Sequence, residues 1–358
     1  MRAKHSKPGP ERSRNRSAEG AIQMKEKDIA ASFVRVVGTG GTISARYDAA
    51  RGSYVSCVPV EAVAGLISKT EQVPVIHFEN FATVPGFEIT LDFVSRLIAR
   101  LRVLVQEPDT EGIVVTQGTD TLEETSFLAD LMVASDKPIV FTGAQLPQDH
   151  PQTDGPRNLL DAIRAAASPD TRGVGVLVGF NGQLHAARDV LKLHTSALEA
   201  FQSPEHGPLG SVDADKVILY RRPVFRRHFE PVELDKRVEL IRLSLGMDGR
   251  SIEQTFDAGV DGIVIEAFGR GNTTAEVGRA IAKAISQGIP VVISSRCIAG
   301  RVQPVYGATG GGGCDIANSG AIFAGNLRGA KARLLLMVAL ADPAAKTDLP
   351  AVFASFAP

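Results

Sequence analysis

Short apolar segments alternate with amphipathic patterns along most of this chain, and this alternation constrains the fold more than any other feature. Strands that are apolar on both faces are expected in a parallel sheet that helices cover from both sides. Their alternation with helices predicts an α/β fold with a mostly parallel sheet. The predicted strands cover residues 33–37, 112–116, 138–142, 173–180, 238–245, 262–267 and 290–294.

Helical periodicity marks several of the segments between these strands. Thr90 is a good N-cap, and apolar residues recur after it at helical spacing from Leu91 to Leu101. Further helices are predicted at residues 120–134, 154–167, 251–257, 274–286 and 330–341.

The alternation breaks between residues 201 and 233, which suggests a domain boundary. A chain of 358 residues is long enough for two domains. We expect a larger N-terminal domain at 30–222, a linker at 223–236 and a smaller C-terminal domain at 237–358. A basic cluster in this stretch is expected to be a solvated linker rather than an anion site; its members are Arg221, Arg222, Arg226 and Arg227.

The first 29 residues differ from the rest, with eight Lys or Arg, four Asp or Glu and little to bury. We expect a disordered basic tail, and no signal peptide because an apolar central region is missing. The net charge of the whole chain is −1, which argues against nucleic acid as a partner. No apolar run approaches about 18 residues, so no membrane span is expected.

Cysteine usage points to a reducing compartment. Cys57, Cys297 and Cys314 are odd in number and widely spaced, which does not suit a disulfide framework. No CxxC or HExxH pattern is present, so no structural or catalytic metal site is predicted. A cytoplasmic location fits best.

The first candidate motif is the glycine-rich turn 38–43. A dinucleotide fingerprint would need a third glycine where Ile43 stands, so that interpretation fails. A plain tight turn is one alternative. The other is a turn that exposes backbone N–H groups beside the hydroxyl of Thr42, which could stabilise an oxyanion and supply a nucleophile.

Two later segments carry a second hydroxyl and a lysine. Asp120 and Glu123 could form a capping box at a helix start, but this does not explain why Thr119 and Thr121 flank the carboxylate. A hydroxyl and a carboxylate there could instead activate water or hold an ammonium group. Lys192 could exchange a proton with a threonine hydroxyl if the fold brings them together.

Taken together, these segments resemble the bacterial-type L-asparaginases, which hydrolyse asparagine to aspartate and ammonia. The resemblance extends from about residue 33 to 341. It is carried in order by 39–43 (TGGTI), 118–121 (GTDT), 142–144 (TGA), 154–156 (DGP), 188–190 (RDV) and 257–262 (DAGVDG). Lys192 follows Thr119 by 73 residues, the separation expected in this family.

The resemblance implies a two-domain α/β fold whose smaller C-terminal domain is flavodoxin-like and completes the site of a neighbouring subunit. It also implies a homotetramer built from intimate dimers, no cofactor and a small amide as substrate. The implied catalytic residues are Thr42 as nucleophile, Tyr54 on a mobile lid, Thr119 with Lys192, and Asp120, which holds the substrate α-ammonium. The implied substrate-binding residues are Gly41, Gly86, Phe87, Gly118, Thr119, Asp120, Ala144 and Asn272.

Several positions depart from the family pattern. Gly86 and Phe87 stand where a serine and often a glutamine grip the substrate α-carboxylate, and Gln117 replaces a common histidine. We therefore expect that Gly86→Ser with Phe87→Gln raises kcat/KM for asparagine. Between residues 301 and 317 only Asp315 could match an acidic residue lent across the subunit interface, and Asn272 is the better candidate for that contact.

Three alternatives to an L-asparaginase remain from the sequence. The first is an amidohydrolase for glutamine or another primary amide, because of Gly86 and Phe87. The second is the amidase subunit of a tRNA-dependent amidotransferase, although residues 1–29 are too few for its additional N-terminal domain. The third is a non-catalytic binding protein, which would have no need for Thr42, Thr119 and Lys192.

Overall fold

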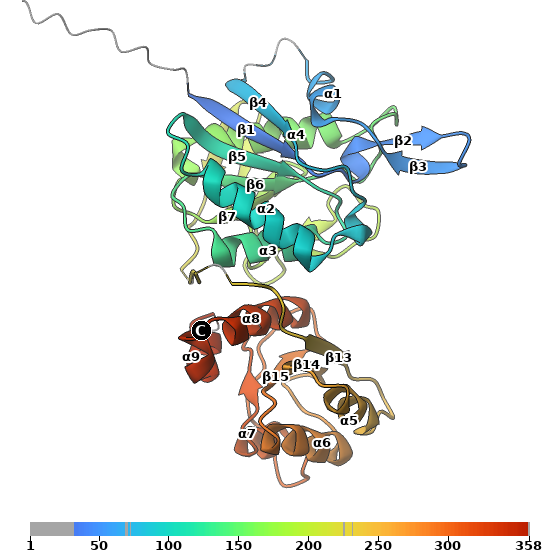
Figure 1. Ribbon diagram of the computed structural model, residues 1–358, viewed down its shortest axis with the longest axis vertical. Helices are drawn as coiled ribbons and strands as arrows, with labels where there is room; N and C mark the ends of the chain where they lie inside the picture. The colour runs from blue at the N-terminus through green and yellow to red at the C-terminus, as the bar shows by residue number, and fades with distance from the viewer. Residues whose placement is uncertain (1–31, 69–70, 72, 225, 231, 357–358) are drawn as a thin grey trace, which may run out of the picture. The chain divides into compact units, whose positions relative to one another are not determined.

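The computed structural model describes residues 32–356 except 69, 70, 72, 225 and 231. The expected basic tail, residues 1–29, lies outside the described residues. Two separate sheets organise the rest of the chain, one in each half (Figure 1). The two-domain α/β fold expected from the sequence is confirmed, and the larger sheet is mixed but mostly parallel.

The large sheet has eight strands in the order β12-β11-β8-β7-β6-β5-β1-β4. The strands from β4 to β7 run parallel to one another, whereas β8, β11 and β12 are added in antiparallel pairings. Their bounds are β1 Phe33–Gly38, β4 Val75–Asn80, β5 Thr110–Thr116, β6 Ile139–Thr142, β7 Val176–Phe180, β8 Gln183–Ala186, β11 Gly210–Asp213 and β12 Lys216–Leu219.

Helices cover both faces of this sheet, which explains why its strands are continuously apolar. Along β1, Val34 and Val36 join the core under α4, whereas Val37 joins the opposite core under α2 and α3. Thr90 caps α2 as expected, since its hydroxyl accepts the Phe93 N–H. The bounds are α1 Val60–Ala64, α2 Leu91–Leu104, α3 Leu122–Met132, α4 Gly155–Ala167, and the short 3-10 turns η1 Thr42–Ser44, η2 Gly86–Glu88 and η3 Pro169–Thr171.

The C-terminal sheet has four parallel strands that follow chain order: β13 Val238–Arg242, β14 Gly262–Ala267, β15 Val291–Ser295 and β16 Ile322–Phe323. α5 (Arg250–Asp257) and α6 (Ala275–Ser286) pack on one face, and α8 (Gly329–Ala341) packs on the other. This is the three-layer arrangement of flavodoxin-like domains. The remaining elements are α7 Gly313–Asn318, η4 Ala345–Asp348 and α9 Leu349–Ala354.

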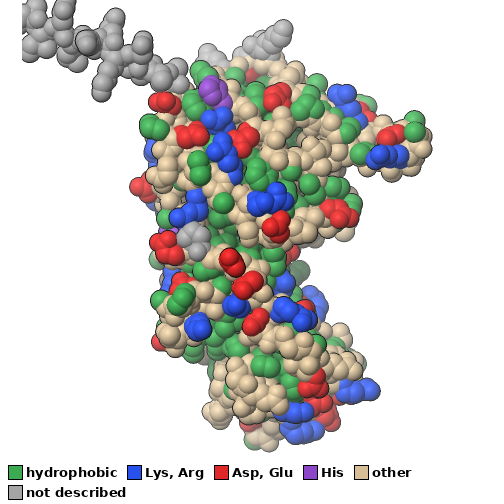
Figure 2. Space-filling model, viewed as in Figure 1, with side chains coloured by type: hydrophobic (Ala, Val, Ile, Leu, Met, Phe, Trp, Pro, Cys, Tyr) green, Lys and Arg blue, Asp and Glu red, His purple; other side chains and the backbone are tan. Residues whose placement is uncertain are grey.

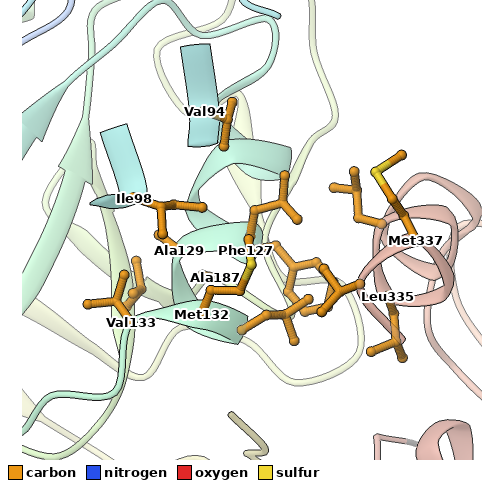
Figure 3. Close-up of a cluster of buried hydrophobic side chains, with 14 of the residues drawn as sticks. Val94, Ile98, Phe127, Ala129, Met132, Val133, Ala187, Leu335 and Met337 are labelled. Carbon is orange, nitrogen blue, oxygen red and sulfur yellow. The ribbon is translucent and has the colours of Figure 1, made fainter. Parts of the chain in front are cut away.

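One apolar core joins the two halves of the chain. α8 packs against α3, so that side chains such as Phe127 and Leu335 belong to the same buried cluster (Figure 3). Val94 and Ile98 of α2, labelled in Figure 3, belong to the same cluster. The C-terminal domain therefore buries the outer face of a helix that starts at the candidate site.

Element boundaries differ from the sequence expectation where backbone conformation overrides the apolar pattern. β7 begins at Val176 rather than at 173, because Gly173 and Gly175 have φ of +70° and +92°, which a strand cannot contain. β13 ends at Arg242 rather than at 245. α3 begins at Leu122 rather than at Asp120.

The arginine cluster after β12 is not a solvated linker, contrary to the sequence expectation. Arg221 donates to the Gly207 carbonyl, Arg222 to the carbonyls of Asp170 and Arg172, and Arg226 to that of Gly173. These guanidinium groups tie the connecting segment onto the N-terminal domain.

Candidate active site

The carboxyl ends of four parallel strands lie at one edge of the large sheet. Gly38 at the end of β1 is level with Thr116 of β5 and Asn80 of β4, and Thr116 is level with Thr142 of β6. In open α/β sheets, sites form in the crevice beyond these ends. The loops that follow these strands carry Thr42, Gly86, Thr119 and Ala144.

Backbone geometry at the first loop depends on glycine. Gly40 and Gly41 have φ of +104° and +84°, a region that side chains disfavour. The turn places Thr42 at the start of η1, with a partly exposed side chain. Among the described residues, the Thr42 hydroxyl has no hydrogen-bond partner. The hydroxyl therefore lies at the sheet edge without an internal partner from these residues.

Three glycines from three loops meet beside Thr42 and Thr119. A Cβ added to Gly41 would lie 2.2 Å from the Gly118 Cα, and one added to Gly118 would lie 2.5 Å from the Gly86 Cα. Nothing larger than hydrogen fits at this contact. The backbones of the three loops approach closely, and Thr42 and Thr119 each follow a glycine of the contact directly.

Lys192 reaches the same place from a distant part of the chain. It lies on the short strand β9 (Leu191–Lys192), which pairs with β10 (Phe201–Gln202). Its Nζ donates to the Thr119 Oγ1 at 2.7 Å and to the Asp120 Oδ1 at 2.7 Å. The structure thus brings together the second hydroxyl, the lysine and the carboxylate that the sequence singled out.

The capping-box alternative for Asp120 is wrong. Thr121 occupies the N-cap position of α3, although its side chain accepts no backbone N–H there. The Asp120 carboxylate instead pairs with Lys192. Glu123, the other member of the supposed box, accepts the backbone N–H of Lys192 instead. The second oxygen of Asp120 has no partner among the described residues, and its side chain is 54% exposed. A cationic group could approach it.

Two backbone groups near this cluster are also unoccupied. The Thr119 N–H and the Ala144 carbonyl have no hydrogen-bond partner in the described part of the chain. The loop that carries Ala144 is held in place by Asp154, whose carboxylate accepts the N–H groups of Gln145 and Leu146 at 2.9–3.1 Å. Asn158 adds a bond from its amide to the Gly143 carbonyl at 3.0 Å.

The segment expected to be a mobile lid forms a β-hairpin of β2 (Ala45–Asp48) and β3 (Ser53–Ser56) that projects from the sheet edge (Figure 1). Tyr54 lies directly opposite Tyr47, with ring centroids 5.4 Å apart, and both rings are more than half exposed. Distance along the chain from Thr42 therefore does not separate the two tyrosines. No contact joins either ring to Thr42 within the residues described.

The positions that depart from the family pattern have distinct surroundings. Gly86 is buried and its carbonyl accepts the Thr121 hydroxyl at 2.8 Å, whereas Phe87 is 71% exposed. Gln117 is fully buried, and its amide donates to the Thr125 hydroxyl at 3.0 Å. Gln117 therefore anchors the first turns of α3 rather than facing the crevice.

The two candidates for a contact across a subunit interface are both engaged within the C-terminal domain. The Asn272 Oδ1 accepts the Gly313 N–H at 3.1 Å. The Asp315 carboxylate accepts four backbone N–H groups of its own glycine-rich loop, from residues 308, 309, 310 and 312. Desolvation acts to raise the pKa of Asp315, but these donors outweigh it and lower the pKa.

The close contact at Gly86 argues against the expectation that Gly86→Ser improves the site. A Cβ there would lie 2.9 Å from the Gly118 carbonyl carbon, so the loop before Thr119 must shift. We expect Gly86→Ser to cost about 1–3 kcal/mol of unfolding free energy and to lower kcat/KM. Urea unfolding and steady-state kinetics check this, with the exposed Phe87→Gln as the matched control. A serine variant that is as stable as wild type and more active would contradict it.

On the face drawn in Figure 2, charged side chains are not gathered into one patch of a single sign. Figure 2 shows basic and acidic groups interspersed over the face drawn. Within the described ranges, no three His, Cys, Asp or Glu side chains lie close enough to hold a metal ion. No helix in the part of the chain that the structure describes is long and apolar enough to cross a membrane.

Sequence reasoning missed residues that act on the backbone of the site. Glu123 was assigned to a helix cap, and Asp154 was noted only as part of a motif. Their roles depend on which main-chain groups lie opposite them, and residue type alone does not reveal this.

Two hydroxyls, a lysine and unpartnered backbone groups at one sheet edge are the parts of a hydrolase that acts through a hydroxyl nucleophile. Comparisons with known proteins agree. Residues 33–225 match the family model "Asparaginase, N-terminal", and residues 237–353 match "Glutaminase/Asparaginase C-terminal domain". The chain belongs to the asparaginase family and is an amidohydrolase.

Alignments with individual relatives cover nearly the whole chain. A probable L-asparaginase of Deinococcus radiodurans is 38% identical, covering 89% of this chain and 96% of the relative. The L-asparaginase of Bacillus licheniformis is 33% identical over 86% and 95% of the two chains. The crystal structure of a probable cytoplasmic L-asparaginase from Campylobacter jejuni is 28% identical, with a TM-score of 0.80, and covers 90% of this chain and 99% of that one.

Proposed function

We propose that this protein hydrolyses L-asparagine to L-aspartate and ammonia through an acyl-enzyme on Thr42. The observation that carries the proposal is the contact of Lys192 Nζ with both Thr119 and Asp120, next to the glycine contact that holds the Thr42 loop. The proposal also rests on the family to which the chain belongs.

Substrate binding is assigned to the unpartnered groups of the site. The free oxygen of Asp120 receives the substrate α-ammonium, and the Ala144 carbonyl accepts an N–H of the side-chain amide. The backbones of Gly41, Gly86 and Gly118 shape the pocket floor, because their contact leaves no room for side chains. Asn272 is assigned to a neighbouring subunit's substrate, and Phe87 forms an exposed rim.

The reaction then follows from the positions of the two hydroxyls. The Thr42 Oγ1 attacks the amide carbon, and the Thr119 N–H stabilises the oxyanion that forms; one such donor is typically worth about 3 kcal/mol. The proton that the Thr42 hydroxyl loses is transferred to the amide nitrogen, the C–N bond breaks and ammonia leaves. Water activated near Thr119 and Lys192 then hydrolyses the ester, while the hairpin that carries Tyr54 closes over the site.

A second candidate is hydrolysis of glutamine or another primary amide. It rests on the pair Gly86 and Phe87 alone, since neither offers the side-chain polar contacts that a serine and a glutamine would give to an α-carboxylate, and the L-asparaginase relatives do not favour it. The threonine chemistry would be unchanged, and only the amino-acid end of the pocket would differ.

The test is ammonia release by the purified protein from L-asparagine, L-glutamine, the D-isomers and simple primary amides. We expect L-asparagine to have the highest kcat/KM. Higher turnover of another amide would support the second candidate. Release from none of them would overturn the proposed function.

We further propose a homotetramer in the cytoplasm. Exposed apolar side chains on the C-terminal domain, including Leu245 and Tyr306, support burial against another subunit. The unpaired Cys57, Cys297 and Cys314 support a reducing compartment, as does the description of the Campylobacter relative as cytoplasmic. Sedimentation velocity would test the oligomer.

A further inference from the structure

Helix α8 of the C-terminal domain carries a buried lysine that the proposed reaction does not use. The side chain of Lys331 is 1% exposed, and its Nζ lies 5.8 Å from the centre of the Phe127 ring of α3. A fully buried ammonium group is costly unless its donors are satisfied. The groups that surround Nζ therefore indicate the role of Lys331.

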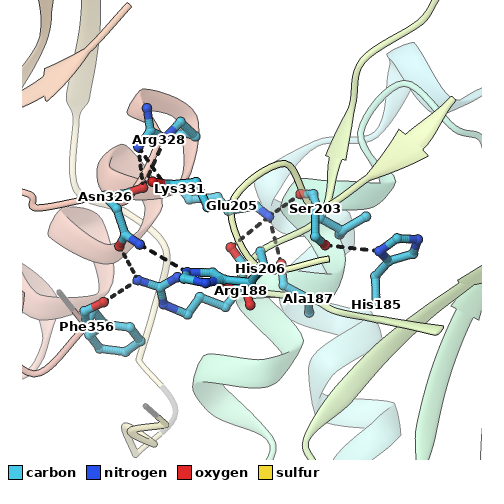
Figure 4. A network of polar contacts seen from close by, with 12 residues as sticks. His185, Ala187, Arg188, Ser203, Glu205, His206, Asn326, Arg328, Lys331 and Phe356 are labelled. Atoms are coloured by element: carbon cyan, nitrogen blue, oxygen red, sulfur yellow. Dashed lines mark hydrogen bonds and ion pairs between the residues drawn. The ribbon is translucent and has the colours of Figure 1, made fainter. Parts of the chain in front are cut away.

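The three donors of the Lys331 ammonium group bind backbone carbonyls in one short turn of the N-terminal domain. Nζ donates to the carbonyls of Ala187, Arg188 and Val190, at 2.7 Å and 3.1 Å for the first two (Figure 4). The carbonyls converge because the chain turns sharply here, with the Asp189 and Val190 N–H groups both bonded to the Ala186 carbonyl. Lys331 thus satisfies three inward-facing carbonyls at once.

This turn leads directly to the lysine of the site. Val190 precedes β9, so the third carbonyl bound by Lys331 lies two residues before Lys192. The Lys192 N–H is bonded to the carboxylate of Glu123 on α3. The backbone entering Lys192 is therefore held by α8 on one side and by α3 on the other, and the side chain is left to reach Thr119.

We propose that Lys331 is a positioning residue, through which the C-terminal domain sets the geometry of the Lys192–Thr119 pair in its own subunit. This inference rests on the proposed function. It means that the C-terminal domain affects the candidate active site of its own chain. A displacement of about 1 Å at a catalytic group can lower a rate about 10²-fold, so the effect on turnover is measurable.

Burial opposes the charged form of this ammonium group, and nearby carboxylates offset part of that cost. Burial lowers the pKa of Lys331 to about 8, against the attraction of Glu123, Asp189 and Glu124, and the nearby Arg188 lowers it further. Arg188 also binds the C-terminal domain through the Asn326 side chain at 2.6 Å and the Phe356 carbonyl. The turn at residues 187–190 is therefore bound to the C-terminal domain through both Lys331 and Arg188.

The decisive variant is Lys331→Ala, assayed by aspartate formation. We expect kcat to fall 10- to 100-fold with KM changed less than about twofold, because the substrate contacts stay intact. The deletion leaves a cavity the size of n-propylammonium, and this cation should restore much of kcat. The matched neutral molecule n-propanol should not, since it offers one donor.

Arg333→Met is the matched control on the same helix. The Arg333 Nε donates to the Val238 carbonyl at 2.7 Å within the C-terminal domain and does not touch the turn before Lys192. We expect its kcat to match wild type even if its melting temperature falls. Unchanged kcat in a folded Lys331→Ala would overturn the proposal. A loss of kcat shared equally by Arg333→Met, or not restored by propylammonium, would also overturn it.

If Lys331→Ala does not fold, Lys331→Gln replaces it. Glutamine keeps two N–H donors for the three carbonyls, so we expect a folded protein with kcat reduced and KM unchanged; wild-type kcat would overturn the proposal. Failure of the proposed function is a separate outcome, because the wild-type protein itself would then release no aspartate from asparagine.

Discussion

Replacing Thr42 with alanine should lower kcat for L-asparagine by about 10⁴-fold or more, the range seen when the nucleophile of a hydrolase is removed. Stability should change little, because the hydroxyl has no hydrogen-bond partner among the described residues. Thr42→Ser should keep measurable turnover, since it retains the attacking oxygen. Steady-state kinetics and thermal unfolding of both variants check these outcomes.

The matched variant Thr119→Ala separates the roles of the two hydroxyls. If Thr42 attacks first, Thr119→Ala should still form an acyl-enzyme on Thr42 that hydrolyses slowly, and mass spectrometry of the quenched protein would locate it. An acyl group on Thr119 in wild type would reverse the assignment. Equal turnover in wild type and both alanine variants would rule out threonine chemistry altogether.

The sequence predicted those parts of the fold that depend on local patterns. β1, β5 and β6 were found within two residues because each is an apolar run covered on both faces, and α2 was found because Thr90 caps a clear helical repeat. The loops that follow these strands were suspected for the same reason, since parallel strands end at a common edge. Local pattern was enough to point to the loops that meet in the candidate site.

Contacts between distant backbones could not be predicted in this way. The glycines at 41, 86 and 118 have ordinary reasons to occur in turns, and only the fold shows that they touch. Gly86 therefore looked like a lost serine, whereas it is a position where a side chain does not fit. The mistaken capping box has the same origin, because Glu123 is engaged by Lys192 from 69 residues away.

The projecting hairpin shows a further limit of reasoning along the chain. Tyr47 is nearer to Thr42 in sequence than Tyr54 is, but the antiparallel register of the hairpin places the two tyrosines opposite each other. Strand pairing changes which residues are neighbours, and a two-residue difference in register would have separated the rings.

Replacing Lys192 with methionine should lower kcat about 10²- to 10⁴-fold, the usual contribution of a positioned proton-transfer group. Methionine has a similar length but no donor, so Thr119 loses its 2.7 Å contact. The protein should still fold, because the partner Asp120 is 54% exposed and such an ion pair adds little stability. KM should not rise, since the freed carboxylate of Asp120 can still hold the substrate ammonium.

Two comparisons make the test of Lys192 specific. Lys137→Met removes another lysine that donates to a backbone carbonyl, that of Glu107, and should leave kcat unchanged. The double variant Lys192→Met with Thr119→Ala should be no slower than the slower single variant, because groups that act as one unit are not additive. Fully multiplicative losses would mean that the two residues act independently. If a folded Lys192→Met variant keeps wild-type kcat, the 2.7 Å contact between Lys192 and Thr119 has a structural role only.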